Sequence, residues 1–423
     1  MRKSLKLGLR GVRRSGGFAV SVALRAVGAL VLVPATIHAG GLQTWSSIVL
    51  GQSLALIAAT ALALGYPLTG PAAIATKSLE AGVAYYRFTG RVRLFVALPC
   101  YAIYVGAVFT LPNPDPVAGL IGSAYVALGG FGATYYFIGR AEPSRLFWAD
   151  TVPRVVPMFA AAIWLGLGGP LLIGLALPAL GALLAIGISN LTIRMSVQRR
   201  CGAGEPSENL SVWGEIRDQI GSATSVMLRA GREALPVLML TPAGPELVGV
   251  YGVFDRVIRQ ANNGLYPVAA ALQGWVPRRI SADFSSRPAV VALLTGVAAA
   301  ASAFLLFITI GMPLVRWLSS GKVTPSLMET VLLSTAIALS MLIRIVDTAC
   351  LVPLGSIRAV MVGNIVGIVA LLVVLPVAFA LNASVVAALT AVVVAYVTQL
   401  LLQLIQMKFI ISRLNRRLLP AQG

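Results

Sequence analysis

Arginine side chains inside apolar segments are the residues of this sequence best suited to chemistry. Each arginine at the centre of a membrane helix costs about 2.5–3.5 kcal/mol on insertion, so these residues must face water, acids or a ligand. Acids at the same depth are fewer: Glu233, Asp255 and Asp347. The arginines that we place there are Arg25, Arg229, Arg232, Arg256, Arg259 and Arg344.

The three acids each have an arginine nearby along the chain. Residues three or four positions apart share one face of a helix and can form an ion pair. The pairs related in this way are Arg229–Glu233, Asp255–Arg259 and Arg344–Asp347. This spacing leaves Arg25, Arg232 and Arg256 without a predicted partner.

The arginines of two neighbouring segments also lie in stripes, Arg229 and Arg232 on one and Arg256 and Arg259 on the next. A guanidinium group stays charged and forks onto phosphate oxygens, so it suits a phosphate-bearing ligand. We therefore predict a cationic cavity for such a ligand; the alternative is that these groups form internal structural pairs. The predicted substrate-binding residues are Arg25, Arg229, Arg232, Arg256 and Arg259.

Coupling to an ion gradient needs a carboxylate at membrane depth. The first half of the chain has Glu80, Asp115, Glu142 and Asp150, all of which we place in loops. Candidates for ion coupling or charge pairing therefore lie in the second half: Glu233, Asp255, Arg344 and Asp347. The sequence predicts no cofactor and no metal, and leaves a proton or sodium gradient open.

The composition indicates the class of fold that must position these residues. The chain has 423 residues, of which 58% are hydrophobic and 11% charged, against roughly 25% charged in soluble domains. A soluble globular protein is excluded, and the chain is predicted to be an all-α polytopic membrane protein. Apolar segments of spanning length, about twelve in all, lie near residues 15–39, 46–74, 94–111, 116–138, 153–168, 170–193, 220–242, 247–275, 289–313, 326–350, 358–381 and 384–410.

The net charge of +19 follows the same layout. Alternate connections, beginning with the N-terminus, carry most of the loop lysines and arginines, whereas the intervening ones hold only Arg316 and Lys322. Positive residues stay on the cytoplasmic side, so both termini are predicted to be cytoplasmic, where these residues also touch anionic lipids. Nucleic acid is not needed to explain the charge.

A polar, breaker-rich stretch at residues 196–211 divides the segments into two sets. We predict a first six-helix lobe over 1–195, a cytoplasmic linker over 196–211 and a second lobe over 212–423. Arg25-Ala26 and Tyr66-Pro67 in the first half match Arg229-Ala230 and Tyr266-Pro267 in the second, as a duplication would produce. The sequence has no Walker A, HExxH or GxSxG motif, so we predict a transporter without ATPase activity and not an enzyme.

Two segments resemble the polysaccharide flippases, the Wzx-type exporters of the MATE-like superfamily. One is the stretch 65–75, and the other is 250–279, where a spaced pattern is similar to that of the family. The residues of that pattern are Tyr251, Asp255, Arg256, Pro267, Pro277 and Arg278. The resemblance implies a V-shaped pair of six-helix lobes whose central cavity opens alternately to the two sides.

The resemblance also implies a substrate, a polyprenyl-diphosphate-linked oligosaccharide such as an O-antigen or lipopolysaccharide repeat unit, carried from the cytoplasmic to the external leaflet of a bacterial inner membrane. Other polysaccharide assembly proteins would be partners, and the chain is expected to be a monomer. A cation-coupled multidrug exporter is the main alternative. A membrane glycopolymer polymerase or ligase is a weaker one, because the sequence has no large external loop.

Overall fold

The computed structural model describes residues 2–198, 211–265, 287–354 and 356–418, together with residues 269, 272 and 276, with side chains described from residue 17 to 196 and from 211 to 412 within these ranges. The described residues form helices and turns and contain no strand. Nine of their helical segments are long and apolar enough to span a membrane. These are Gly17–Ala75, Leu79–Thr110, Pro116–Gly139, Pro143–Gly166, Leu171–Ser196, Arg287–Leu318, Leu327–Leu351, Ile357–Leu381 and Val385–Ser412.

The first of these segments accommodates two predicted spans. It has 59 residues, about 88 Å of helix at 1.5 Å per residue, whereas the hydrocarbon core is about 30 Å thick. Helix α1 (Arg2–Ala63) is interrupted at Gly41, whose φ of 77° and ψ of 178° are non-helical. The break falls between the predicted segments 15–39 and 46–74.

Two further predicted spans correspond to helices with more charge. They are α9 (Val212–Leu240) and α10 (Pro245–Gly264), which match the segments at 220–242 and 247–275; the part of the latter beyond residue 265 lies largely outside the described residues. The predicted all-α polytopic membrane fold is therefore confirmed. The chain is a multi-pass membrane protein, and large apolar side chains such as Leu98 and Ile103 lie exposed on its helices, as a surface against lipid requires.

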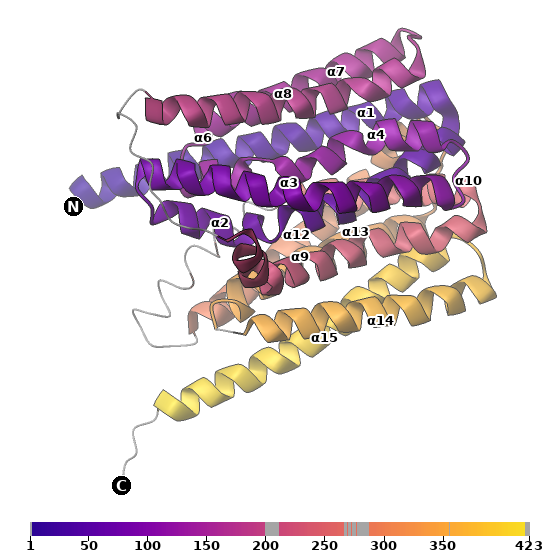
Figure 1. Ribbon diagram of the computed structural model, residues 1–423. Helices are drawn as coiled ribbons and strands as arrows, with labels where there is room; N and C mark the ends of the chain where they lie inside the picture. The colour runs from indigo at the N-terminus through magenta and orange to yellow at the C-terminus, as the bar shows by residue number, and fades with distance from the viewer. Residues whose placement is uncertain are drawn as a thin grey trace. The chain divides into compact units, whose positions relative to one another are not determined.

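The chain divides into two compact units, Met1–Gly252 and Val253–Gly423. In the first unit, α7 and α8 run side by side, and α1 packs against α4, α7 and α9 (Figure 1). Its other elements are α2 (Tyr66–Ala75), α3 (Leu79–Thr110), α4 (Pro116–Ala127), η1 (Leu128–Phe131), α5 (Thr134–Gly139), α6 (Pro143–Leu146), η2 (Phe147–Thr151), α7 (Val152–Gly166), α8 (Leu171–Gln198) and η3 (Thr241–Ala243).

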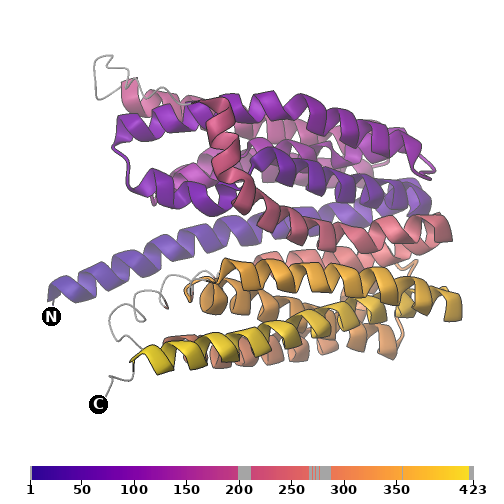
Figure 2. The same cartoon turned by 60° about the horizontal axis from the view of Figure 1, so that its bottom comes forward.

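The second unit begins within α10. Its α14 lies beside α15, and α13 packs against both α12 and α15 (Figure 2). The elements after α10 are α12 (Arg287–Leu318), α13 (Leu327–Ile345), η4 (Val346–Leu351), α14 (Ile357–Leu381) and α15 (Val385–Leu418). The predicted lobes, 1–195 and 212–423, stay a prediction, and most of the predicted linker, residues 199–210, lies outside the described residues.

Two short segments, η2 and η4, are π-helical. A π-helical turn contains an extra residue within an otherwise regular helix and often marks a functional site. Each of the two continues directly from or into α-helix, and each carries a buried aspartate, Asp150 in η2 and Asp347 in η4.

Candidate functional site

A charged cluster in the first unit joins α1 to the end of η2 and the start of α7. Asp150, whose side chain is 1% exposed, accepts a hydrogen bond from Nη2 of Arg25 at its Oδ2 atom. Its Oδ1 atom accepts one from Nε of Arg154 at 3.0 Å. The sequence placed Asp150 in a loop and left Arg25 without a partner, and both predictions are wrong. The reason is that helical structure begins at Pro143 rather than at residue 153, so η2 carries Asp150 into the helix bundle.

Close packing of α1 on α6 and α7 brings these groups together. A Cβ atom on Gly17 would lie 2.9 Å from Cβ of Pro143, which is too close, whereas one on Gly28 would lie 3.4 Å from Cγ1 of Val155, an ordinary contact. The two glycines stand on either side of Arg25 along α1, and Gly17 allows α1 to approach α6. From α8, Ser189 donates a hydrogen bond to the backbone oxygen of Ala149 at 3.1 Å and supports η2.

The cluster carries one negative and two positive charges. Both carboxylate oxygens of Asp150 are occupied, but each guanidinium uses a single nitrogen for this contact, and a guanidinium has five N–H donors. The Nε atom of Arg25 is buried without a hydrogen-bond partner in the described structure, while 31% of its side chain remains exposed. The cluster therefore retains donors and a net positive charge that suit an anion.

A second buried arginine, Arg93 on α3, differs in this respect. Its Nε donates to the backbone oxygen of Thr89 at 3.3 Å, its Nη1 to those of Gly130 and Gly132 at 3.2 Å, and its Nη2 to the hydroxyl of Tyr135 at 3.2 Å. Three rings surround it, those of Tyr66, Tyr86 and Tyr135, at 5.3–6.0 Å from the guanidinium carbon. Because the apolar segment begins at residue 94, Arg93 is predicted to lie in a loop; in the structure it is 2% exposed. Its hydrogen bonds to Gly130 and Gly132 stabilise the irregular turn η1 that follows α4.

The other arginines of the predicted cavity lie on α9 and α10. On α9, Arg232 is buried, whereas Arg229 and Glu233 are half-buried. On α10, Arg256 is buried, and Asp255 accepts a hydrogen bond from Nε of Arg259 at 2.6 Å. The predicted pair Asp255–Arg259 is thus confirmed. A cavity shared by all five predicted arginines stays a prediction.

Asp347 lies in the buried part of the second unit. Its Oδ1 atom accepts a hydrogen bond from Nε2 of Gln403 on α15 at 2.7 Å, and the two residues are 7% and 0% exposed. Arg344 is half-buried in the last turn of α13. Its predicted pairing with Asp347, like that of Arg229 with Glu233, stays a prediction.

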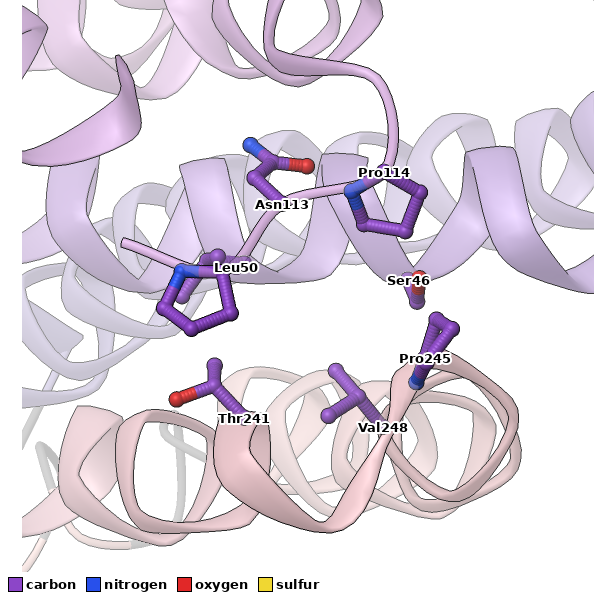
Figure 3. Close-up of a pocket in the computed structure, with 8 residues that line it drawn as sticks. Ser46, Leu50, Asn113, Pro114, Thr241, Pro245 and Val248 are labelled. Carbon is purple, nitrogen blue, oxygen red and sulfur yellow. The ribbon is translucent and has the colours of Figure 1, made fainter. Parts of the chain in front are cut away.

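A cavity of about 300 Å³ lies elsewhere in the first unit (Figure 3). Its lining is uncharged, so it is not the anion site. Within the described residues, no group of three His, Cys, Asp or Glu side chains could hold a metal ion. The cavity is lined by Ser46, Leu50, Pro112, Asn113, Pro114, Thr241, Pro245 and Val248.

Solved structures share this architecture. An inward-facing multidrug resistance MATE family transporter of the MOP superfamily aligns over 93% of this chain and 96% of its own, with 12% identity and a TM-score of 0.68. The lipid II flippase MurJ, in an inward closed conformation, aligns over 95% and 90%, with 11% identity and a TM-score of 0.63. The MATE multidrug transporter DinF-BH aligns over 95% of both chains, with 14% identity and a TM-score of 0.58.

These identities are low, so the likeness concerns the fold. No family model matches the chain, and no curated protein does. The MATE-like fold expected from the sequence is confirmed. The narrower resemblance, to the polysaccharide flippases, stays a prediction, and three residues of its pattern, Pro267, Pro277 and Arg278, lie outside the described residues.

Proposed function

We propose that this chain is a flippase that moves a polyprenyl-diphosphate-linked oligosaccharide from the cytoplasmic to the external leaflet. The two sets of helices would open a central cavity to each side in turn, as expected for the fold. The chain would act without ATP hydrolysis, in the inner membrane of a bacterium and as a monomer, beside other proteins of surface polysaccharide assembly. Its basic cytoplasmic loops would contact anionic lipid headgroups.

The excess of arginine over carboxylate within the membrane helices carries the proposal. The structure adds Asp150 to the buried acids and both Arg93 and Arg154 to the buried arginines, so arginine remains in excess. A diphosphate supplies the missing negative charge, and guanidinium groups can bind its oxygens in pairs. Arg25, whose side chain is partly exposed, is the arginine of the first unit whose surroundings best suit this role.

Export requires that binding be reversible. An ion pair with a partly exposed arginine contributes up to about 1 kcal/mol, so two or three such contacts hold a lipid-linked diphosphate without trapping it. The remaining affinity would come from the lipid chain and the glycan. This reasoning favours a site in which only some of the five predicted arginines touch the ligand at any one time.

Substitution of the cavity arginines tests the function. Arg25→Ala and Arg256→Ala should each stop the appearance of surface polymer in cells whose own gene is replaced, while the protein remains in the membrane at the normal level. Arg145→Ala is the matched control. It also removes an arginine with an ion-pair partner, Glu142, but this arginine is exposed and its partner lies only three residues away in the chain. Normal export by both cavity variants would refute the proposal.

A cation-coupled multidrug exporter is the second candidate. The buried Asp347, which accepts a hydrogen bond from Gln403, gives this candidate a membrane carboxylate, and solved MATE structures share the fold. It predicts that Asp255→Asn or Asp347→Asn abolishes efflux of cationic dyes from cells or vesicles. Efflux that survives both substitutions would exclude it.

A further inference from the structure

We propose that Asp150 is a built-in counter-ion, which binds Arg25 when no ligand is present and is displaced from it when a diphosphate binds. This inference rests on the role of Arg25 in the proposed function. It assigns to Asp150 a positioning and regulatory role at the same site.

The position of Asp150 fits a competitor better than a simple structural pair. Its carboxylate is 1% exposed, whereas the guanidinium of Arg25 reaches it from a side chain that is 31% exposed. One partner is therefore enclosed in the helix bundle, whereas the other is partly accessible. A ligand that reaches this cluster can contact Arg25 but not the carboxylate of Asp150.

Arg154 makes displacement feasible. Loss of one partner of a buried ion pair is costly, because an unpaired charge is left behind. When Arg25 turns to a ligand, Asp150 keeps the bond from Nε of Arg154 at 3.0 Å, from a residue one turn along the same helix. The carboxylate is never left without a cation.

The π-helical turn and its supports keep Asp150 in place. Ser189 of α8 donates a hydrogen bond to the backbone oxygen of Ala149, and α1 packs along α7. Arg25 is therefore the movable member of the cluster. Its Nε atom is buried and without a hydrogen-bond partner in the described structure, so a change of partner costs that atom nothing.

Binding of inorganic pyrophosphate to the full-length protein in neutral detergent tests the inference by isothermal titration calorimetry. Asp150→Asn removes the competitor and should bind pyrophosphate about tenfold more tightly, which corresponds to about 1.4 kcal/mol. Asp150→Asn combined with Arg154→Gln keeps the net charge of the cluster and should also bind more tightly than the wild type. Arg25→Gln should bind about fivefold more weakly, which corresponds to about 1 kcal/mol.

Glu142→Gln is the matched control, since it removes a carboxylate from a partly exposed pair at the start of α6 and should leave the affinity unchanged. The combined variant separates displacement from a mere gain of positive charge. If it binds no more tightly than the wild type, Asp150 is a structural residue and the inference is wrong. Weaker binding by Asp150→Asn has the same meaning.

A measurement on wild-type protein covers the case in which the Asp150 variants do not fold. Infrared difference spectra should show a shift of a buried carboxylate band when pyrophosphate is added, and Arg25→Gln should abolish that shift. An unchanged band overturns the inference. If pyrophosphate displaces Asp150 but Arg25→Ala exports polymer normally, only the proposed function fails; if export is lost and displacement is absent, only this inference fails.

Discussion

Replacement of Arg93 by alanine should destabilise the first unit more than any other single arginine substitution on α3. Arg93 makes four hydrogen bonds, and three of them go to backbone oxygens, two of which belong to the irregular stretch after α4. Alanine would leave these oxygens without their charged donor and the tyrosine rings beside an empty space.

The size of the effect follows from these contacts. A hydrogen bond to a charged group contributes about 1.5–3 kcal/mol, and bonds in one network do not add fully. We therefore expect the free energy of unfolding to fall by about 3–5 kcal/mol, as for other broken buried networks. At about 2 °C per kcal/mol, the value for large chains, the Tm should fall by at least about 6 °C.

Thermal unfolding in neutral detergent, followed by size-exclusion chromatography of heated samples, measures the change in Tm. Arg91→Ala is the control, because Arg91 lies on the same helix with its side chain exposed and should shift the Tm by less than about 1 °C. Arg93→Lys should fall between the two, since lysine keeps the charge but lacks the planar fork. Equal Tm values for Arg93→Ala and Arg91→Ala would refute the reasoning.

Two further substitutions test helix packing and helix capping. Gly51→Ala should lower the free energy of unfolding by about 1–3 kcal/mol, because its Cβ would lie 2.4 Å from the backbone oxygen of Gly119; Gly106→Ala, with no atom within 4 Å, should not lower it. Tm measurements of both variants decide the point, and equal losses would contradict it. Ser326→Ala breaks a capping box with Glu329 at the start of α13 and should cost about 1 kcal/mol; an unchanged denaturation midpoint would show that this cap contributes nothing.

Much of the membrane layout could be predicted because lipid imposes simple rules on sequence. Apolar length locates the spans, and charges in alternate connections orient them. The boundary between the predicted segments 15–39 and 46–74 agrees with the break at Gly41. The helices α9 and α10 were also expected, although their charges weaken the apolar signal.

The candidate site was predicted less well, because apolar length says little about helix ends. α3 begins at Leu79 and the helix through Asp150 at Pro143, both well before the apolar stretches that mark them. Polar residues at those ends were therefore assigned to loops. Asp150 and Arg154 have the same i,i+4 spacing as Asp255 and Arg259. The pair would have been predicted if the helix had been expected to begin before residue 150.

The contact between Arg25 and Asp150 could not be predicted from spacing. The two residues are 125 positions apart in the chain, and their meeting depends on how closely α1 approaches α6 and α7. The absence of a side chain at Gly17 permits the approach to α6, but many glycines in the sequence do not face another helix so closely. Three-dimensional packing decides which of them matter.

The π-helical turn at η2 also sets the phase between two parts of one membrane helix. An extra residue rotates everything beyond it by about 100° but lengthens the helix by only about 1.5 Å. Pro143–Leu146 and Val152–Gly166 can therefore present faces that a regular helix would not align, and the same holds on either side of η4. Gain or loss of one residue at either place would change which side chains face the interior, while the length of the membrane helix would stay almost the same. A protein of this fold can therefore acquire a different inner surface through a single-residue insertion or deletion.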